Sequence, residues 1–221
     1  FTRRVAPRCA TNRHMHPACC ARAAYRALLV ALAASAGAAW AATVQVDVRD
    51  GAGKPVEGAV VFLESAEAQR AARPLPGIEM AQEHKRFVPG VLAVTTGTEV
   101  HFPNHDAVRH HVYSFSPAKK FELKLYSGTP ANPVRFDTPG VVVLGCNIHD
   151  QMVAWILVVD TPYFAHSGPA GRVLLDGVPA GAYRLRTWHP GLPVGAAALA
   201  QPLSVGPVPA SAAVVLTGLT P

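Results

Sequence analysis

The sequence predicts an all-β protein in which one β-sandwich is inserted in, or flanked by, a second and smaller β-sandwich. Of the 221 residues, 50% are hydrophobic and only 15% are charged, while 18 Gly and 20 Pro supply many turns. Such a composition is typical of short strands joined by turns. Segments in which apolar residues alternate with polar ones, or follow one another without a break, recur about every ten residues. Patterns that favour helices are scarce after residue 45.

Residues 1–41 are interpreted as an export signal preceded by upstream residues. Arg22 and Arg26 come before the apolar run ALLVALAASAGAAW, which is too short to span a bilayer comfortably. The A-x-A pattern that ends at Ala41 is typical of signal-peptide cleavage sites. We therefore expect cleavage after Ala41, a periplasmic mature protein and no stable membrane insertion of the mature chain.

The distribution of charge argues against a nucleic-acid partner. The formal net charge is +6, but six of the 20 basic residues precede residue 42. The remaining basic residues balance the 14 acidic ones, so the body of the chain is neutral. Because no basic groove is indicated, we expect no binding to nucleic acid.

The two outer blocks, 42–66 and 161–221, are expected to form the smaller β-domain together. The first block reads as two strands around the turn DGAGKPVEG, with Val44, Val46 and Val48 alternating with polar residues. The last block contains GRVLLDGVPAGAYRLRTW and a final strand near AAVVLTGL. Each block is too short to bury a core alone, so we expect them to pair with each other. The stretch EAQRAARPLPG that follows the first block is interpreted as a linker.

The middle block, residues 78–160, is expected to be the larger sandwich. Strands are predicted in RFVPGVLAVTTGTEVHFPN on either side of a Thr-Gly-Thr turn, in RHHVYSFS and in KKFELKLYSG. The runs VVVLG and MVAWILVVD are continuously apolar, as expected for strands at the centre of a sandwich. The middle block is therefore expected to hold its own core.

The short stretch GCNIHDQM, between these two apolar runs, holds three soft side chains. Cys146, His149 and Met152 are spaced three residues apart. The β-branched flanks favour a tight loop, which can curl the three side chains around one point. A thiolate, an imidazole and a thioether suit copper far better than Mg²⁺ or Ca²⁺, and zinc would want more Cys or His. Cleavage of the export signal also leaves Cys146 as the only cysteine of the mature chain, which excludes a disulfide within it.

A blue-copper centre needs a second histidine from elsewhere in the chain. The upstream segment FPNHDAVRHHVYSF offers three candidates, which are His105, His110 and His111. Spacing alone does not choose among them. Because His110 and His111 are adjacent in a predicted strand, we expect their side chains to point to opposite faces.

Residues 78–160 resemble the cupredoxin family, which includes plastocyanin, pseudoazurin and amicyanin. The segments that carry the resemblance are RFVPGVLAVTTGTEVHFPN, the later HHV and the loop CNIHDQM. The family places a Phe-x-Asn strand end before an HNV triplet, and Phe102, Asn104 and the triplet that begins at His110 stand in the corresponding places. The resemblance implies a Greek-key sandwich that binds one copper ion, with the contracted ligand loop of amicyanin. The implied copper ligands are His110, Cys146, His149 and Met152.

The sequence departs from the cupredoxin pattern at two places. His111 stands where the family usually has Asn, whose hydrogen bonds tie the two ligand loops together. Asp150 and Gln151 follow His149, where amicyanin has apolar residues, so we expect a more polar rim. His111 therefore stays open as a replacement for His110 or as its support.

Two further resemblances concern longer parts of the chain. HHVYSFSPAK, LGCNIHD and VVDTPYF look like segments of exported bacterial proteins often labelled methylamine utilization proteins. The two outer blocks look like the ends of a carboxypeptidase regulatory-like, transthyretin-like β-domain. This second resemblance implies an accessory domain and carries no catalytic residues.

The cupredoxin resemblance implies an electron carrier, which cycles copper between Cu(II) and Cu(I) and exchanges electrons with a redox partner protein. No nucleophile elbow, H-E-x-x-H helix or phosphate-cradling glycine loop occurs in the sequence, so no enzyme activity is expected. Two alternatives stay open. One is a copper chaperone or storage module without redox turnover, and the other is an interaction module whose metal is structural or lost.

Overall fold

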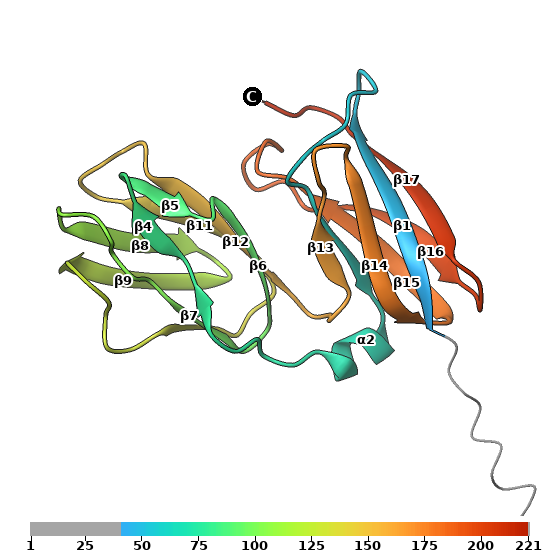
Figure 1. Ribbon diagram of the computed structural model, residues 1–221, viewed down its shortest axis with the longest axis horizontal. Coiled ribbons are helices and arrows are strands. Elements are labelled where there is room, and N and C mark those ends of the chain that lie inside the picture. Colours follow the sequence, from blue (N-terminus) through green and yellow to red (C-terminus); the bar gives the residue numbers. More distant parts are fainter. Residues whose placement is uncertain (1–40, 221) are drawn as a thin grey trace, which may run out of the picture. The chain divides into compact units, whose positions relative to one another are not determined.

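The computed structural model describes residues 41–220, and nearly all of their regular structure is β-strand (Figure 1). This confirms the predicted all-β class. The predicted export signal, apart from its last residue, lies outside the described residues. Within residues 41–220 no helix is both long and apolar enough to cross a bilayer.

The outer blocks of the chain form two sheets around one core. Their strands are β1 (Ala41–Asp50), β2 (Val60–Glu64), β13 (Phe164–His166), β14 (Arg172–Pro179), β15 (Gly181–Trp188), β16 (Leu199–Val205) and β17 (Ala210–Leu216). One sheet has the order β14-β1-β17 and the other has the order β13-β2-β15-β16. The alternation in β1 buries Val44, Val46 and Val48 completely. They share an apolar cluster with Leu63 and Leu185 of the second sheet.

A short helix, α2 (Ala66–Ala71), begins the stretch interpreted as a linker. Ser65 caps this helix, because its Oγ accepts a hydrogen bond from the Ala68 backbone N–H at 3.0 Å. Ala68 is buried in the core of the outer blocks. The sequence does not reveal the helix because one buried alanine gives no apolar period.

The middle of the chain forms the remaining sheets. Their strands are β3 (Ile78–Glu79), β4 (Ala81–Glu83), β5 (Arg86–Val88), β6 (Val91–Thr95), β7 (Thr98–His101), β8 (His110–Ser116), β9 (Lys119–Tyr126), β10 (Val134–Phe136), β11 (Gly140–Cys146) and β12 (Val153–Val159). A five-stranded sheet has the order β6-β12-β11-β8-β9, a three-stranded sheet has the order β10-β7-β3, and β4 pairs with β5. Phe102, Phe136, Leu144 and Ile156 belong to the buried cluster of this part of the chain.

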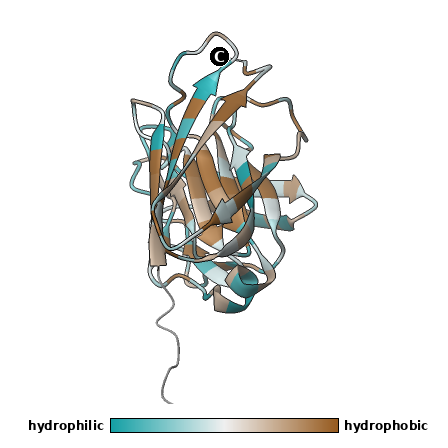
Figure 2. Ribbon diagram, turned by 90° about the vertical axis from the view of Figure 1, so that its right-hand side faces the viewer, coloured by the Kyte–Doolittle hydropathy of each residue, from teal (hydrophilic) through white to brown (hydrophobic). Residues whose placement is uncertain are grey.

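The environment of β12 explains why the run MVAWILVVD is apolar without alternation. β12 pairs antiparallel with β11 and parallel with β6, so it lies inside the five-stranded sheet. Ile156 belongs to the core of the middle block, whereas Leu157 belongs to a separate cluster with Phe62 and Trp188. Both faces of β12 are therefore buried from Ile156 to Val159, whereas Val153 at the start of the strand is exposed. Figure 2 shows the hydrophobic residues concentrated along the central strands.

The described residues belong to one compact unit. The division into a cupredoxin domain over 78–160 and an accessory domain over 42–66 and 161–221 stays a prediction. Strands β3, β4, β5, β10, β13 and β16 are not evident from the sequence. The first five span two or three residues each, and β16 is an edge strand that contains Pro202, so none shows a sustained apolar pattern.

Candidate metal centre

The predicted ligand residues come from neighbouring parts of the five-stranded sheet. His110 is the first residue of β8, Cys146 is the last residue of β11, and His149 lies in the loop that leads to β12. Strands β8 and β11 pair antiparallel, with Cys146 opposite Val112. The loop is closed by a hydrogen bond of 2.9 Å, which the Met152 backbone N–H donates to the His149 carbonyl. The paired ends of β8 and β11 and a tight turn thus gather these residues at one end of the five-stranded sheet, where these strands meet the loop.

Two imidazole nitrogens lie near the Cys146 thiol. Nδ1 of His110 is 3.8 Å from Cys146 Sγ, and Nδ1 of His149 is 3.9 Å from it. One ligand atom from each of the three residues lies within 4.8 Å of the other two. His110 and Cys146 are 0% and 3% exposed, whereas His149 is half-buried. His149 is therefore the member of the cluster that reaches solvent.

The spacing of these atoms fits a bound copper ion. Metal bonds of about 2.0 Å to nitrogen and about 2.3 Å to sulfur, the lengths known from zinc sites, place the two donor atoms about 3.7 Å apart when they meet at about 120°. The separations of 3.8 and 3.9 Å between nitrogen and sulfur lie close to this value. One thiolate with two imidazoles is also the trigonal donor set of a blue-copper site. The cluster thus has the donor chemistry of a copper site, and its dimensions suit a metal ion held by these three residues.

Met152 is buried in the same apolar cluster as Cys146, with 1% of its surface exposed. It comes directly before β12, at the end of the loop that carries His149. This burial is compatible with the long axial thioether of blue-copper sites. The structure brings His110, Cys146 and His149 together, and the complete set with Met152 stays a prediction.

His111 lies outside this cluster. Its Nε2 is 2.9 Å from Glu122 Oε1 but is not aligned for a hydrogen bond. Its ring packs edge-on against Tyr113, with 6.1 Å between the ring centroids. The backbone links the two ligand segments instead, because the Asn147 N–H donates a hydrogen bond of 3.3 Å to the His111 carbonyl. Hence the side chain of His111 does not replace the Asn of the cupredoxin pattern.

Asp106 lies behind His110, on the side of the ring away from Cys146, and the sequence does not point to it. Its Oδ2 is 2.7 Å from Nε2 of His110, the ring nitrogen that does not face Cys146. Burial acts to raise the pKa of Asp106, but hydrogen bonds from the Lys85 backbone N–H and from His110 hold the pKa below its usual value. Asp106 precedes β8 by four residues and lies in a loop, where sequence spacing does not predict where a side chain points.

Asn104 fixes the loop that joins Asp106 to β8. Its Nδ2 donates hydrogen bonds to the carbonyls of Val108 and Tyr126, at 2.9 and 3.0 Å. Its Oδ1 accepts a hydrogen bond of 2.9 Å from the Asp106 backbone N–H. With only 5% of its surface exposed, Asn104 needs all these partners. The loop therefore has a defined path to His110.

Gly145, directly before Cys146, leaves room for the ring of Tyr113. It stands opposite Tyr113 across the β8–β11 pair. A Cβ at this position would lie 2.8 Å from both Cζ and Oη of Tyr113. A glycine is thus required if the Tyr113 ring is to cover the chain beside the Cys146 thiol.

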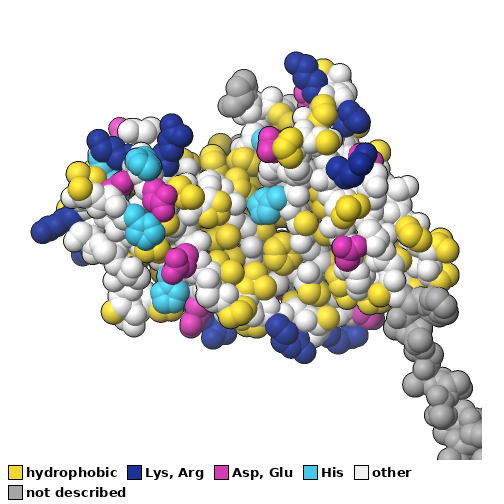
Figure 3. Space-filling view, in the orientation of Figure 1, with side chains coloured by type: hydrophobic (Ala, Val, Ile, Leu, Met, Phe, Trp, Pro, Cys, Tyr) yellow, Lys and Arg dark blue, Asp and Glu magenta, His cyan; other side chains and the backbone are white. Residues whose placement is uncertain are grey.

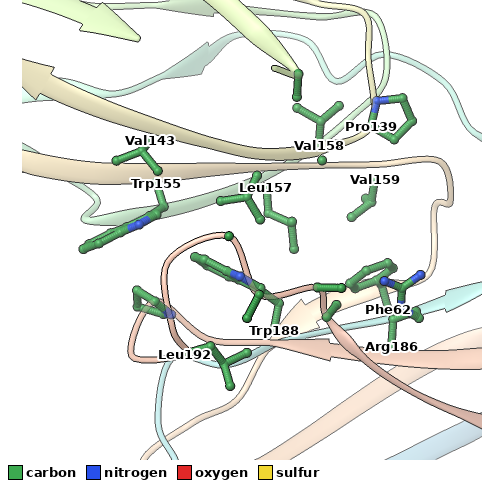
Figure 4. Close-up of a pocket in the computed structure, with 18 of the residues that line it drawn as sticks. Phe62, Pro139, Val143, Trp155, Leu157, Val158, Val159, Arg186, Trp188 and Leu192 are labelled. Atoms are coloured by element: carbon green, nitrogen blue, oxygen red, sulfur yellow. The ribbon is translucent and has the colours of Figure 1, made fainter. Parts of the chain in front are cut away.

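A separate apolar pocket of about 670 Å³ is lined by other residues. Trp155 and Leu157 of β12 line one side, and Trp188 and Leu192 line the other (Figure 4). None of the four predicted ligands lines it. Figure 3 shows hydrophobic side chains gathered in the middle of the face that it draws. This pocket is thus not part of the candidate metal centre.

No protein-family model matches the chain, and no curated protein sequence matches it. Among solved structures, the chain is similar to a copper-containing nitrite reductase from Thermus scotoductus SA-01, with 26% identity and a TM-score of 0.36 over 40% of this chain. It covers only 23% of that reductase.

Two smaller proteins also match. A purple cupredoxin from Nitrosopumilus maritimus has 20% identity and a TM-score of 0.33 over 37% of this chain and 99% of its own. Amicyanin from Paracoccus versutus has 15% identity and a TM-score of 0.33 over 45% of this chain and 97% of its own. In all three comparisons the similarity is confined to less than half of the chain.

Proposed function

We propose that the protein is a periplasmic electron carrier of the cupredoxin type, whose metal is copper bound by His110, Cys146, His149 and Met152. The observation that carries this proposal is the placement of two imidazole Nδ1 atoms at 3.8 and 3.9 Å from one buried thiol. Copper bound there would supply a one-electron couple between Cu(II) and Cu(I). One redox partner protein would give the electron and another would take it.

The rigidity of the donor residues suits this function. Fast electron exchange needs a site that changes little between the two oxidation states, and strand pairing holds two of the three clustered donors. His110 and Cys146 lie in the paired strands β8 and β11 and are almost completely buried. The thiolate of Cys146 and the two imidazoles are soft or borderline donors, which both oxidation states of copper accept.

The half-buried ring of His149 is the proposed route for electrons. It is the one member of the three-residue cluster that reaches solvent. A partner that docks over this ring would approach the metal without entering the protein. The apolar pocket, lined by Trp155 and Trp188, contains none of the donors. This arrangement favours electron transfer to a docked protein over catalysis on a bound substrate.

The proposal extends to export and to the accessory domain. The basic residues and apolar run of residues 1–41 support export to the periplasm with cleavage after Ala41. Residues 42–66 and 161–221 would form the accessory β-domain. The N-terminal sequence of protein recovered from a periplasmic fraction tests the first part, since the proposal requires it to begin at Ala42.

Optical spectroscopy of the purified protein loaded with Cu(II) tests the function. We expect an intense thiolate-to-Cu(II) absorption band that a reductant bleaches and an oxidant restores through several cycles. The variant Cys146→Ala should lose the band, whereas the control His111→Asn should keep it. A colourless protein that binds only Cu(I) and passes it on would instead identify a copper chaperone.

A further inference from the structure

We infer that Asp106 is a positioning residue of the metal centre, which orients His110 and favours the oxidised state of the bound metal. This inference rests on the proposed function for its effect on copper. Its first part, the orientation of the His110 ring, holds for the metal-free protein as well. The two parts therefore have separate tests.

The hydrogen bond between Asp106 and His110 decides which ring nitrogen faces the thiol. Asp106 Oδ2 lies 2.7 Å from Nε2 of His110, and the ring is completely buried. A carboxylate accepts a hydrogen bond, so Nε2 carries the proton in the neutral ring. The lone pair is then on Nδ1, which is 3.8 Å from Cys146 Sγ. This is the tautomer that a metal between the two residues needs.

A strained turn holds the Asp106 carboxylate in place. His84 and Lys85 connect β4 to β5 with φ angles of 52° and 56°. Such left-handed pairs form two-residue hairpin turns that usually contain Asn-Gly, because most other residues adopt this conformation only with backbone strain. The His84 N–H donates to Oδ1 of Asp106 at 2.7 Å and the Lys85 N–H donates to Oδ2 at 2.9 Å. The turn thus presents two donors to the carboxylate that contacts His110.

The pair formed by His105 and Glu83 provides an internal comparison. His105 Nδ1 lies 2.9 Å from Glu83 Oε1, so the chemistry and distance resemble those of Asp106 and His110. The side chains are 55% and 40% exposed, however, whereas those of His110 and Asp106 are 0% and 14% exposed. Solvent screens the outer pair, and this pair does not include a proposed ligand. Glu83→Gln is therefore a matched control for Asp106→Asn.

The charge of Asp106 should affect the two oxidation states of copper unequally. A negative charge in contact with a ligand stabilises Cu(II) more than Cu(I), because the ion of higher charge gains more from it. Asp106→Asn keeps the shape of the side chain and removes the charge. We expect the ratio of Cu(II) affinity to Cu(I) affinity to fall about tenfold, which corresponds to a rise of about 59 mV in the one-electron potential.

The first test is ¹⁵N NMR of the assigned His110 ring in the copper-free protein at neutral pH. We expect the tautomer with the proton on Nε2. A proton on Nδ1 would overturn the positioning role, and this outcome needs no variant that might fail to fold. The result is independent of copper, so a protein without a copper couple would refute the proposed function without touching this measurement.

The second test is voltammetry of the copper-loaded protein. Asp106→Asn should raise the potential by the amount given above, and Glu83→Gln should leave the affinity ratio within about twofold of the original. Circular dichroism of both variants checks that they are folded. Equal potentials for the two variants would overturn the electrostatic role of Asp106.

Discussion

Replacement of Gly145 by alanine tests the packing that brings Cys146 to its place. The new Cβ would lie 2.8 Å from Cζ and Oη of Tyr113 and 3.3 Å from Cε1. An unstrained carbon contact needs about 3.5 Å or more, so the ring must move by more than half an ångström. Tyr113 is half-buried and its ring can tilt outward, at the expense of its contacts with His111 and Phe115.

We therefore expect Gly145→Ala to lower the free energy of unfolding by about 1–2 kcal/mol, in the lower part of the range for overpacked sites. Urea unfolding followed by circular dichroism measures the change. A double-mutant cycle with Tyr113→Ala gives the mechanism, because removal of the ring should abolish the cost of the added methyl group. Additive effects of Gly145→Ala and Tyr113→Ala would refute the explanation by steric overlap.

Three further predictions concern stability. Tyr126→Phe should lower the free energy of unfolding in urea by about 1–3 kcal/mol. The Tyr126 hydroxyl donates a hydrogen bond of 2.8 Å to the fully buried Gln82. Burial raises the pKa of Tyr126 to about 12, so the hydroxyl keeps its proton and remains a donor. Burial lowers the pKa of His189 from 6.5, so the unfolded chain binds the proton more readily and the free energy of unfolding should fall as pH drops through that value. His189→Gln should flatten this pH dependence, and an unchanged slope would contradict it. Added Cu(II) should raise the melting temperature of the original protein but not of Cys146→Ala, and equal shifts would place the copper elsewhere.

The main strands could be predicted because their burial follows from pattern alone. β1 alternates since one face is covered, and β12 is apolar without alternation from Ile156 to Val159 since both faces are covered there. The hairpin from β4 to β5 gives no such signal. Its turn contains His84 and Lys85 where Asn-Gly would be expected, and the hydrogen bonds that support this turn come from a residue more than 20 positions away.

Part of the candidate site could also be predicted from the pattern of the sequence. The spacing of Cys146, His149 and Met152 identifies a soft donor set, because these residues share one short loop. The choice between His110 and His111 depends on which of the two side chains lies on the buried face of the five-stranded sheet, and the register is irregular at this point of the β8–β9 pair. Asp106 acts across a loop, where sequence distance and spatial direction are unrelated.

X-ray absorption spectroscopy at the copper edge is the most direct test of which residues bind the metal. We expect copper bound to the purified protein to have one short sulfur ligand and two imidazole nitrogens. The short sulfur ligand should disappear in Cys146→Ala, and one imidazole should disappear in a variant that lacks His110. A copper shell without a short sulfur ligand, or one that still contains it after Cys146→Ala, would contradict the assignment of the metal centre.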